Sequence, residues 1–343
     1  MKNVTLGRTG IEVPQNAFGA LPIQRISHEA AVALLRRAYE GGMRYFDTAR
    51  AYSDSEEKLG MAFGDGLRKK LYIATKTMAK TPEDFRKDLD TSLSMLRTDY
   101  IDVYQFHCAD QCYRPGDGTG MYECMQKAKE EGKIRHIGIT AHKIGVAMEV
   151  AESGLYETLQ FPFSYLSGKK EDELVRLCQK NEVGFVCMKG LAGGLIRDAR
   201  SAMAFVAQYE GALPIWGIQR EAELKEWLSF MDDTPSMTEE VRAFIEKERS
   251  ELSGEFCRGC GYCMPCPAGI TINQCARMSL MLRRAPSKAW LNDYWQKEMK
   301  KIEGCLHCKK CMSHCPYELN TPELLRKNYE DYQKVLSGEV KVS

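Results

Sequence analysis

The C-terminal third of this 343-residue chain carries two short runs of closely spaced cysteines. The first reads C-x2-C-x2-C-x2-C-P over residues 257–267, and the second reads C-x2-C-x2-C-x3-C-P over residues 305–316. Intervals of two residues let successive thiolates curl around a single inorganic cluster, while the cysteine before proline points to a neighbouring one. The two runs supply eight thiolates, so their spacing predicts two [4Fe–4S] clusters.

The crossover of the last cysteine in each run predicts which thiolates share a cluster. One cluster is expected on Cys257, Cys260, Cys263 and Cys315, and the other on Cys266, Cys305, Cys308 and Cys311. Two all-cysteine zinc sites are the alternative, because C-x2-C is also a zinc spacing. Four cysteines in each run, and a Cys-Pro pair at the end of each, favour the clusters.

A second group of chemically useful residues follows short apolar runs in the first two-thirds of the chain. Asp47 ends one such run and Tyr52 lies five residues later. Lys76 ends another, and His107 follows a third. If these side chains meet, they can reduce a carbonyl: Tyr52 would protonate the nascent alkoxide as hydride arrives, and His107 would hydrogen-bond the carbonyl oxygen. Because a phenol has a pKa of about 10, Lys76 is expected to lower the Tyr52 pKa, with Asp47 holding Lys76 in place.

The elements that position these residues alternate regularly between strand and helix. Strands are expected at Asn16–Ala20, Met43–Asp47, Leu71–Lys76, Ile101–Phe106, Ile134–Ile139, Thr158–Phe161, Val183–Cys187 and Leu213–Trp216. Helices are expected at Glu29–Glu40, Pro82–Leu96, Tyr122–Glu131, Gly145–Glu152, Glu171–Lys180, Arg197–Gln208 and Glu221–Phe230. Such alternation predicts parallel strands with crossover helices, and the short, regular units favour a (β/α)8 TIM barrel over a doubly wound sheet. Barrel active sites lie at the carboxyl ends of the strands, where the four polar residues fall.

The pattern changes after Met231. A charged helix is expected at Glu239–Ser253, a second at about Asn273–Arg284 and a closing one at Pro322–Leu336, with the cysteine runs between them. We therefore predict a barrel domain over residues 1–232 and a small, mostly helical ferredoxin-like domain that binds two clusters over residues 233–343.

Several motifs resemble those of the aldo-keto reductase family. Leu6–Gly10 is similar to the family's opening turn, and Phe46–Ala49 with Tyr52, and Gly132–Gly138, are similar to its internal motifs. With the cysteine runs, the whole chain resembles the iron–sulfur branch of that family, in which a barrel is fused to a two-cluster ferredoxin-like domain. The resemblance implies that the catalytic tetrad is Asp47, Tyr52, Lys76 and His107.

The resemblance also implies a nicotinamide cofactor across the barrel mouth. Contacts to the nicotinamide are implied for Thr140, His142 and Gln160, with Met188 where the family has a stacking aromatic residue. The resemblance also implies a phosphate site, formed by a glycine-rich loop and by the N-terminus of a helix. Its residues would be Lys189, Gly193, Gly194, Gly217, Ile218, Gln219 and Arg220. Glu223 and Trp227 stand where the family grips a 2′-phosphate and adenine, and Glu223 would repel that phosphate. NADH is therefore expected over NADPH, and the same loops could instead take FMN.

Three functions remain open from the sequence. The first is an oxidoreductase that reduces a carbonyl or enone of a small organic molecule with hydride from a nicotinamide cofactor. In the second, a ferredoxin or another carrier feeds electrons through the clusters to barrel-bound FMN, because clusters pass single electrons whereas hydride carries two. In the third, the chain transfers electrons or senses redox state and the barrel is a scaffold.

Charge, hydrophobicity and cysteine content limit the partners and the cellular compartment that we expect for this chain. A net charge of +1 leaves no basic footprint for nucleic acid, and no apolar run reaches the ~18 residues of a membrane span. The fourteen cysteines follow no secretory signal, which indicates ligation in a reducing compartment rather than disulfides. A cytoplasmic, anaerobic enzyme is expected, with no nucleic-acid or membrane partner.

Overall fold

The computed structural model describes residues 1–64, 66–252, 256–284, 287–315 and 317–342. Its contacts divide the chain into two compact units. The barrel unit comprises Met1–Gly190 and Asp198–Ile245, and the cysteine unit comprises Leu191–Arg197 and Glu246–Ser343. The domain boundary expected between residues 232 and 233 stays a prediction.

Within the described residues of the barrel unit, eight strands close into a barrel in the order β10-β3-β4-β5-β6-β7-β8-β9, and every neighbouring pair is parallel. The strands are β3 (Ala17–Gly19), β4 (Tyr45–Asp47), β5 (Tyr72–Thr77), β6 (Ile101–Ala109), β7 (Ile134–Ala141), β8 (Thr158–Pro162), β9 (Gly184–Met188) and β10 (Ala212–Gly217). Each coincides with a strand expected from the sequence. The predicted (β/α)8 architecture is therefore confirmed.

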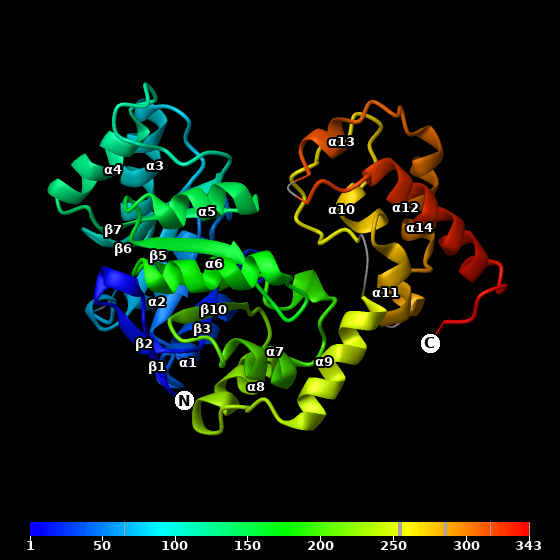
Figure 1. Cartoon of the computed structure of the whole chain (residues 1–343), viewed down its shortest axis with the longest axis horizontal. Helices are drawn as coiled ribbons and strands as arrows, with labels where there is room; N and C mark the ends of the chain where they lie inside the picture. The colour runs from blue at the N-terminus through cyan, green and yellow to red at the C-terminus, as the bar shows by residue number, and fades with distance from the viewer. Residues whose placement is uncertain (65, 253–255, 285–286, 316, 343) are drawn as a thin grey trace. The chain divides into compact units, whose positions relative to one another are not determined.

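Helices surround the strands (Figure 1). They are α1 (His28–Glu40), α2 (Ser55–Phe63), α3 (Pro82–Met95), α4 (Met121–Glu130), α5 (Ile144–Glu152), α6 (Lys169–Lys180), α7 (Ala199–Val206) and α8 (Glu221–Asp232). Side-chain caps fix the starts of α1 and α3: Ser27 Oγ accepts from Ala30 N at 3.2 Å, and Thr81 Oγ1 accepts from Asp84 N at 3.2 Å, just before Pro82. Helix α2 was not expected from the sequence.

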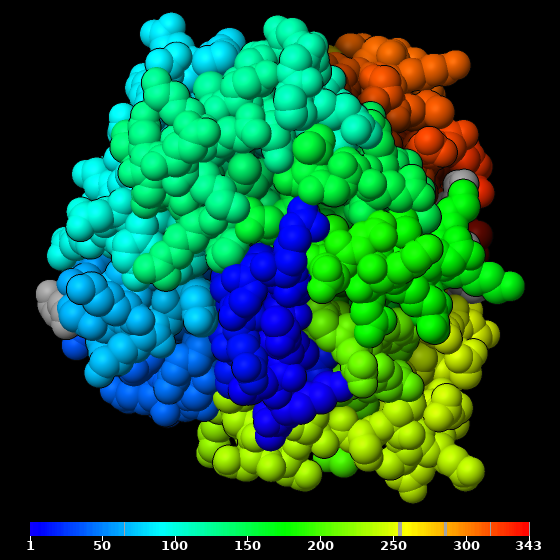
Figure 2. Space-filling view, turned by 60° about the vertical axis from the view of Figure 1, so that its left-hand side comes forward, coloured from blue at the N-terminus to red at the C-terminus, as the bar shows by residue number. Residues whose placement is uncertain are grey.

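A hairpin of β1 (Asn3–Thr5) and β2 (Glu12–Pro14) covers the amino ends of the barrel strands. Val4 faces Val13 across it, and both pack into a buried cluster with Ala17, Tyr45 and other residues from the first halves of the strands. Figure 2 shows this N-terminal segment, in dark blue, running across one face of the unit. Because the hairpin covers the amino ends of the strands, it does not cover the carboxyl ends, where the site residues lie.

The cysteine unit contains helices and loops in its described part. Its helices are the end of α9 (Glu239–Glu251), then α10 (Ile272–Cys275), α11 (Met278–Arg284), α12 (Asp293–Lys300), α13 (Lys310–Ser313) and α14 (Thr321–Leu336). Short 3₁₀ helices complete the two units: η1 (Gly7–Thr9), η2 (Pro22–Arg25), η3 (Arg68–Lys70), η4 (Ala192–Gly194), η5 (Ser287–Ala289) and η6 (Lys301–Gly304). The helices expected around residues 239, 273 and 322 are present, whereas Ser253 and Pro316 lie outside the described residues. No helix in the described part of the chain is long and apolar enough to cross a membrane.

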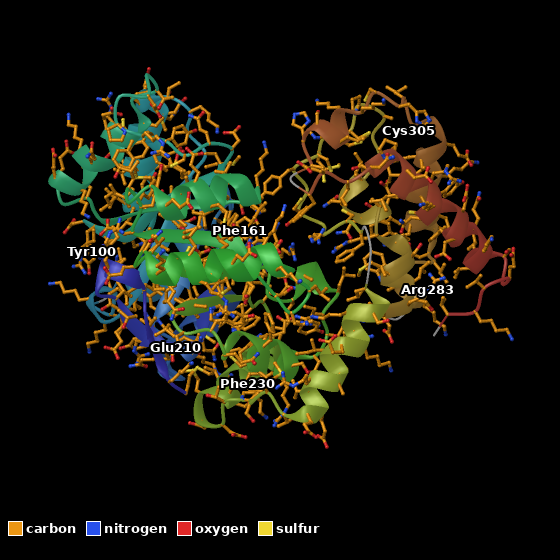
Figure 3. All side chains as sticks on the ribbon, in the orientation of Figure 1. Tyr100, Phe161, Glu210, Phe230, Arg283 and Cys305 are labelled. Carbon is orange, nitrogen blue, oxygen red and sulfur yellow. The ribbon has the colours of Figure 1, made fainter. Side chains whose placement is uncertain are left out.

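A small apolar core holds the cysteine unit together. It includes Ile270, Met278, Met299, Leu325 and Tyr332, with the cluster-run cysteines packed around it. In Figure 3, Cys305 and Arg283 are labelled toward opposite ends of this unit. The core of the cysteine unit therefore borders cysteine side chains of both runs.

The loop Leu191–Arg197 leads out of β9 toward α7, yet it belongs to the cysteine unit. Arg277 donates from Nη1 to the Gly193 carbonyl at 2.8 Å, and Arg284 donates from Nη1 to the Leu195 carbonyl at 2.9 Å. Gly193 has φ +69°, and a Cβ there would lie 2.8 Å from the Arg258 carbonyl oxygen. Two arginines of the cysteine unit therefore fix a loop that the sequence assigned to the barrel.

Candidate active site

The centre of the site is a buried ion pair between adjacent strands. Lys76 on β5 donates from Nζ to Asp47 Oδ1 at the end of β4, at 2.6 Å, and to the Thr48 carbonyl at 2.6 Å. Lys76 is 0% exposed and Asp47 is 2% exposed. Gln105 of β6 donates from Nε2 to Asp47 Oδ2 at 3.3 Å. Such burial is tolerated because each charge has an opposite partner and further hydrogen bonds.

Tyr52 lies over this pair, on the loop between β4 and α2. Its ring centroid is 5.3 Å from Lys76 Nζ and 5.7 Å from the His107 ring, which it meets edge-on at 82°. The loop is held by backbone and side-chain bonds: Arg50 N donates to the Lys76 carbonyl at 3.0 Å, and Ser55 Oγ donates to the Ala20 carbonyl at 2.9 Å. The structure thus brings all four tetrad candidates together at the carboxyl ends of the strands.

The Tyr52 hydroxyl is held in its protonated form. Burial raises the Tyr52 pKa well above its usual value, and the nearby Asp47 and Cys108 raise it further. This differs from the expectation that Lys76 lowers the pKa of Tyr52. The reason is burial, which disfavours the charged phenolate, while the nearby Lys76 ammonium already binds Asp47 and the Thr48 carbonyl.

His107 reaches the site through an irregularity in β6. The pairing of β6 with β7 shifts register between Phe106 and Ala109, and Cys108 adopts φ 54° with its amide donating to Thr140 Oγ1 at 2.7 Å. A bulge of this kind re-aims a side chain at a strand end. Burial, with the positive charges of Lys76 and Lys189, lowers the His107 pKa to about 3. The imidazole is therefore neutral, and its Nδ1 has no hydrogen-bond partner among the described residues.

Polar groups at the ends of β7, β8 and β9 extend the site. The buried Gln160 also bonds Asp47 through its side chain, and its Oε1 has no partner within the described chain. Lys189 donates from Nζ to Nε2 of His142 at 3.2 Å, and burial together with the Lys189 charge lowers the His142 pKa. A buried carbonyl oxygen without a donor suits a ligand that presents an amide N–H.

The residues of the expected phosphate site are divided between the two units, and this site stays a prediction. In the barrel unit Met188 ends β9 and Lys189 follows it, and Gly217, Ile218, Gln219 and Arg220 lead from β10 to α8. Gly193 and Gly194 belong to the cysteine unit. The amides of Gln219 and Arg220 both donate to Glu223 Oε2 at 3.0 Å. The carboxylate of Glu223 thus occupies the N-terminus of α8, where a phosphate was expected.

Trp227 is not available as an adenine contact. It stacks on Trp216 with ring centroids 3.9 Å apart and planes 8° from parallel, and it is 2% exposed. A Cβ on Gly190 would lie 2.5 Å from the Trp216 ring, so this glycine makes room for the stacked pair. The two tryptophans therefore pack within the barrel unit.

Sequence reasoning missed Gln105 and Glu56. Gln105 holds Asp47 from the middle of β6, and buried Glu56 accepts from Thr75 Oγ1 at 2.6 Å and pairs with Arg50 near Tyr52. A polar residue inside an otherwise apolar strand was a usable signal for Gln105. Glu56 lies on α2, the helix that the sequence did not reveal.

Two cavities in the cysteine unit divide the run cysteines between them. One is lined by Cys257, Cys260, Cys263 and Cys315, and the other is lined by Cys263, Cys266, Cys305, Cys308 and Cys311. Among the described residues, no three His, Cys, Asp or Glu side chains lie close enough to hold one metal ion. Eight thiolates in two runs of this spacing, each ending in a Cys-Pro pair, are the donor set of [4Fe–4S] clusters.

Comparison with known proteins agrees with this geometry. The model of the Aldo/keto reductase family matches residues 16–208, more than half of the chain. The chain belongs to the aldo/keto reductase family. A 4Fe-4S dicluster domain matches residues 256–320, which confirms an aldo-keto reductase barrel with a C-terminal iron–sulfur region.

Two curated relatives each match somewhat more than half of the chain. L-galactose dehydrogenase of Arabidopsis thaliana is 30% identical over 216 residues, which are 56% of this chain and 66% of that protein. The aldo-keto reductase YhdN of Bacillus subtilis is 28% identical over 214 residues, 57% of this chain and 64% of that protein. The chain thus spans slightly under two thirds of the length of these relatives.

Solved structures resemble the fold at low identity. An aldo-keto reductase from Bacillus halodurans in its holo form has a TM-score of 0.63 at 24% identity, covering 72% of this chain and 96% of that one. One from Klebsiella pneumoniae in complex with NADPH has a TM-score of 0.62 at 23% identity, covering 72% and 95%. At this identity the likeness concerns the fold alone.

Proposed function

We propose that the chain is an oxidoreductase that reduces the carbonyl, or a conjugated enone, of a small organic molecule, with Tyr52 as proton donor and a nicotinamide cofactor as hydride source. The observation that carries this proposal is the buried Lys76–Asp47 pair beneath a protonated Tyr52, with neutral His107 beside it. Tyr52 provides a proton, Lys76 provides a positive charge that stabilises the phenolate left behind, and His107 provides a neutral hydrogen-bond donor beside them.

The chain's own residues account for the proton half of the reaction. A nicotinamide cofactor, when bound, supplies hydride to the carbonyl carbon. Tyr52 then gives its hydroxyl proton to the carbonyl oxygen, so the C=O bond becomes an alcohol and the phenol becomes a phenolate. The Lys76 ammonium, 5.3 Å from the ring, stabilises that phenolate, and Asp47 holds Lys76 in place.

His107 acts as an orienting group in this proposal. Its pKa of about 3 keeps the imidazole neutral, so one ring nitrogen donates and the other accepts. A donor aimed at the carbonyl oxygen polarises it before the proton moves. We assign this role to His107 because its ring meets that of Tyr52 edge-on.

The residues around the mouth fit a nicotinamide better than a 2′-phosphate. The unpartnered Oε1 of buried Gln160 suits the N–H of a carboxamide, with Thr140, His142, Met188 and Lys189 nearby along the strand ends. At α8, the carboxylate of Glu223 already takes the amides of Gln219 and Arg220 and would repel a 2′-phosphate. We therefore propose NADH as the preferred donor, although the related Klebsiella pneumoniae structure contains NADPH.

We further propose the ligand sets of the two clusters from the two cavities. The first set is Cys257, Cys260, Cys263 and Cys315, and the second is Cys266, Cys305, Cys308 and Cys311. Cys263 borders both cavities, and we assign it to the first set because the cysteine of each Cys-Pro pair, Cys266 or Cys315, is expected to be the crossover ligand. Bound clusters supply one-electron chemistry.

The proposed function is tested by removing one hydroxyl. The full chain is purified without oxygen, its clusters intact, and assayed for NADH oxidation with small aldehydes, ketones and enones. Tyr52→Phe should lower kcat about 10²- to 10⁴-fold while NADH still binds, because only the proton donor is lost. Tyr39→Phe removes a hydroxyl on α1, outside the site, and should leave kcat unchanged. Equal kcat for wild type and Tyr52→Phe would refute the proposal.

A further inference from the structure

One cysteine of the second ligand set reaches the surface. All fourteen cysteines lie in the described residues, and Cys308 alone is exposed, whereas Cys257 of the first set is buried. Where a cysteine that binds a cluster is exposed, the edge of that cluster lies close to solvent. Electron transfer between proteins weakens steeply with distance, so the cluster on Cys308 is the better placed of the two for exchange with another molecule.

The surface around this cysteine is basic with an apolar centre. We call Leu306, His307, Cys308, Lys309 and Lys310 the Cys308 face; all five line the second cavity and all are exposed, Leu306 by 65%. The sequence from residue 304 to 314 contains no carboxylate. Neither lysine forms an ion pair with a described residue, in contrast to many lysines elsewhere in the chain.

The backbone presents these side chains outward. His307 and Lys309, which flank Cys308, both adopt left-handed backbone conformations, with φ 49° and 58°. The side chains of Lys309 and Lys310 are both exposed.

We propose that the Cys308 face docks an acidic one-electron carrier protein that delivers electrons to the second cluster. The exposed ligand provides a short path, Leu306 a small apolar contact, and Lys309 and Lys310 the charge complementary to an acidic partner. Small, weak interfaces of this kind are typical of electron-transfer encounters. Nucleic acid is a poorer fit, because the chain has a net charge of +1 and the face has only two lysines.

The step is balanced without bond formation. One electron leaves the reduced carrier, which becomes oxidised, and enters the second cluster, which becomes reduced. Each encounter transfers one electron, and the step ends with the second cluster reduced by that electron. The docking proposal concerns the cysteine unit and does not depend on the role of Tyr52.

The test measures cluster reduction rather than carbonyl turnover. The probe is a photoreduced acidic [2Fe–2S] ferredoxin, mixed rapidly with the anaerobic holoprotein while cluster absorbance is followed. The variant is Lys309→Glu with Lys310→Glu. The matched control is Lys297→Glu with Lys300→Glu on α12, two exposed lysines that make the same charge change in the same unit without lining the cavity.

We expect the second-order rate constant for cluster reduction by ferredoxin to fall about tenfold in the Lys309/Lys310 variant. In the control variant this rate constant should stay near the wild-type value. The wild-type rate should also fall with added salt, because exposed charges are screened. Reduced methyl viologen, a small cation that needs no docking, should reduce all three proteins at equal rates. Iron analysis checks that the variants keep both clusters, and Lys309→Gln with Lys310→Gln replaces the Glu pair if iron is lost.

Either of two results would overturn the proposal. One is an equal ferredoxin rate for wild type and the Lys309/Lys310 variant. The other is anionic lipid vesicles binding through these lysines while the ferredoxin rate shows no salt dependence. Loss of carbonyl reduction in Tyr52→Phe would leave both readouts unchanged, so failure of docking and failure of the proposed chemistry are distinguishable.

Discussion

At the residue scale, the site depends on charges that are held away from water. Lys76 and Asp47 are both buried and satisfy each other, and His107 has lost its affinity for protons. The sequence identified all four tetrad candidates, because each terminates or follows an apolar strand. It gave the wrong direction for the Tyr52 pKa, because neither burial nor the commitment of Lys76 to Asp47 is visible in a strand pattern.

His107 should remain neutral across the working pH range. Burial depresses its pKa to about 3, so the folded protein takes up no proton there until far below pH 6.5, whereas the unfolded chain does. Between these values stability falls with falling pH. NMR of ring-labelled histidine should show no titration of His107 from pH 8 to pH 5. An apparent pKa of about 6.5 would contradict the geometry.

Glu223 should set the choice between NADH and NADPH. Glu223→Gln keeps an oxygen to accept from the α8 amides but removes the charge that repels a 2′-phosphate. We expect the KM for NADPH relative to that for NADH to fall about fivefold. Glu226→Gln makes the same change on an exposed position of the same helix and should leave the ratio unaltered. A ratio that moves equally in both variants would assign the preference elsewhere.

At the element scale, strands with strong apolar runs were predictable and short elements were not. All eight barrel strands match because each is a buried run bounded by turn residues. The β1–β2 hairpin consists of two three-residue strands with one buried valine each, too short for a periodic signal. Helix α2 was missed because it is only nine residues long and Gly60 interrupts its pattern. A Cβ on Gly60 would lie 2.1 Å from the Met95 carbonyl oxygen, so close packing requires that glycine.

The loop Leu191–Arg197 should respond differently to two neighbouring substitutions. Gly193→Ala combines φ +69° with a Cβ 2.8 Å from the Arg258 carbonyl oxygen and 2.9 Å from Arg277 Nη1. Gly194→Ala has φ +93° but nothing within 4 Å of its Cβ, so it bears the backbone strain alone. We expect Gly193→Ala to destabilise the holoprotein by about 1–3 kcal/mol more than Gly194→Ala, measured by thermal unfolding. Equal melting temperatures would show that Arg277 and Arg258 do not constrain this loop.

At the scale of the whole molecule, the two units differ in how their cores are built. The barrel unit has a closed sheet with helices around it, whereas the core of the cysteine unit packs against the cysteines of its two cavities. The division of the cysteines between two clusters stays a prediction, and their spacing gave no sign that a loop after β9 belongs to the cysteine unit. That assignment depends on Arg277 and Arg284, which follow the first cysteine run and carry no sequence signal for a distant loop.

Removal of iron should unfold one unit and spare the other. Loss of the clusters leaves eight thiols around a small core, so we expect the cysteine unit to lose protection while the barrel retains it. Treating the holoprotein with a chelator and oxidant, followed by limited proteolysis, should leave a protected fragment spanning β1 to α8. If the whole chain resists cleavage after iron is removed, the clusters do not hold the cysteine unit together.

The most direct test of the account follows the hydride itself. The anaerobic holoprotein is given NADH with deuterium at both C4 positions and a reducible aldehyde or ketone, and the alcohol is analysed by mass spectrometry and NMR. Hydride transfer from nicotinamide to substrate, with Tyr52 supplying only the proton, predicts one deuterium on the former carbonyl carbon and none retained on oxygen after work-up in H₂O. An alcohol without deuterium at that carbon would contradict the account and show that electrons reach the substrate by another carrier, such as flavin.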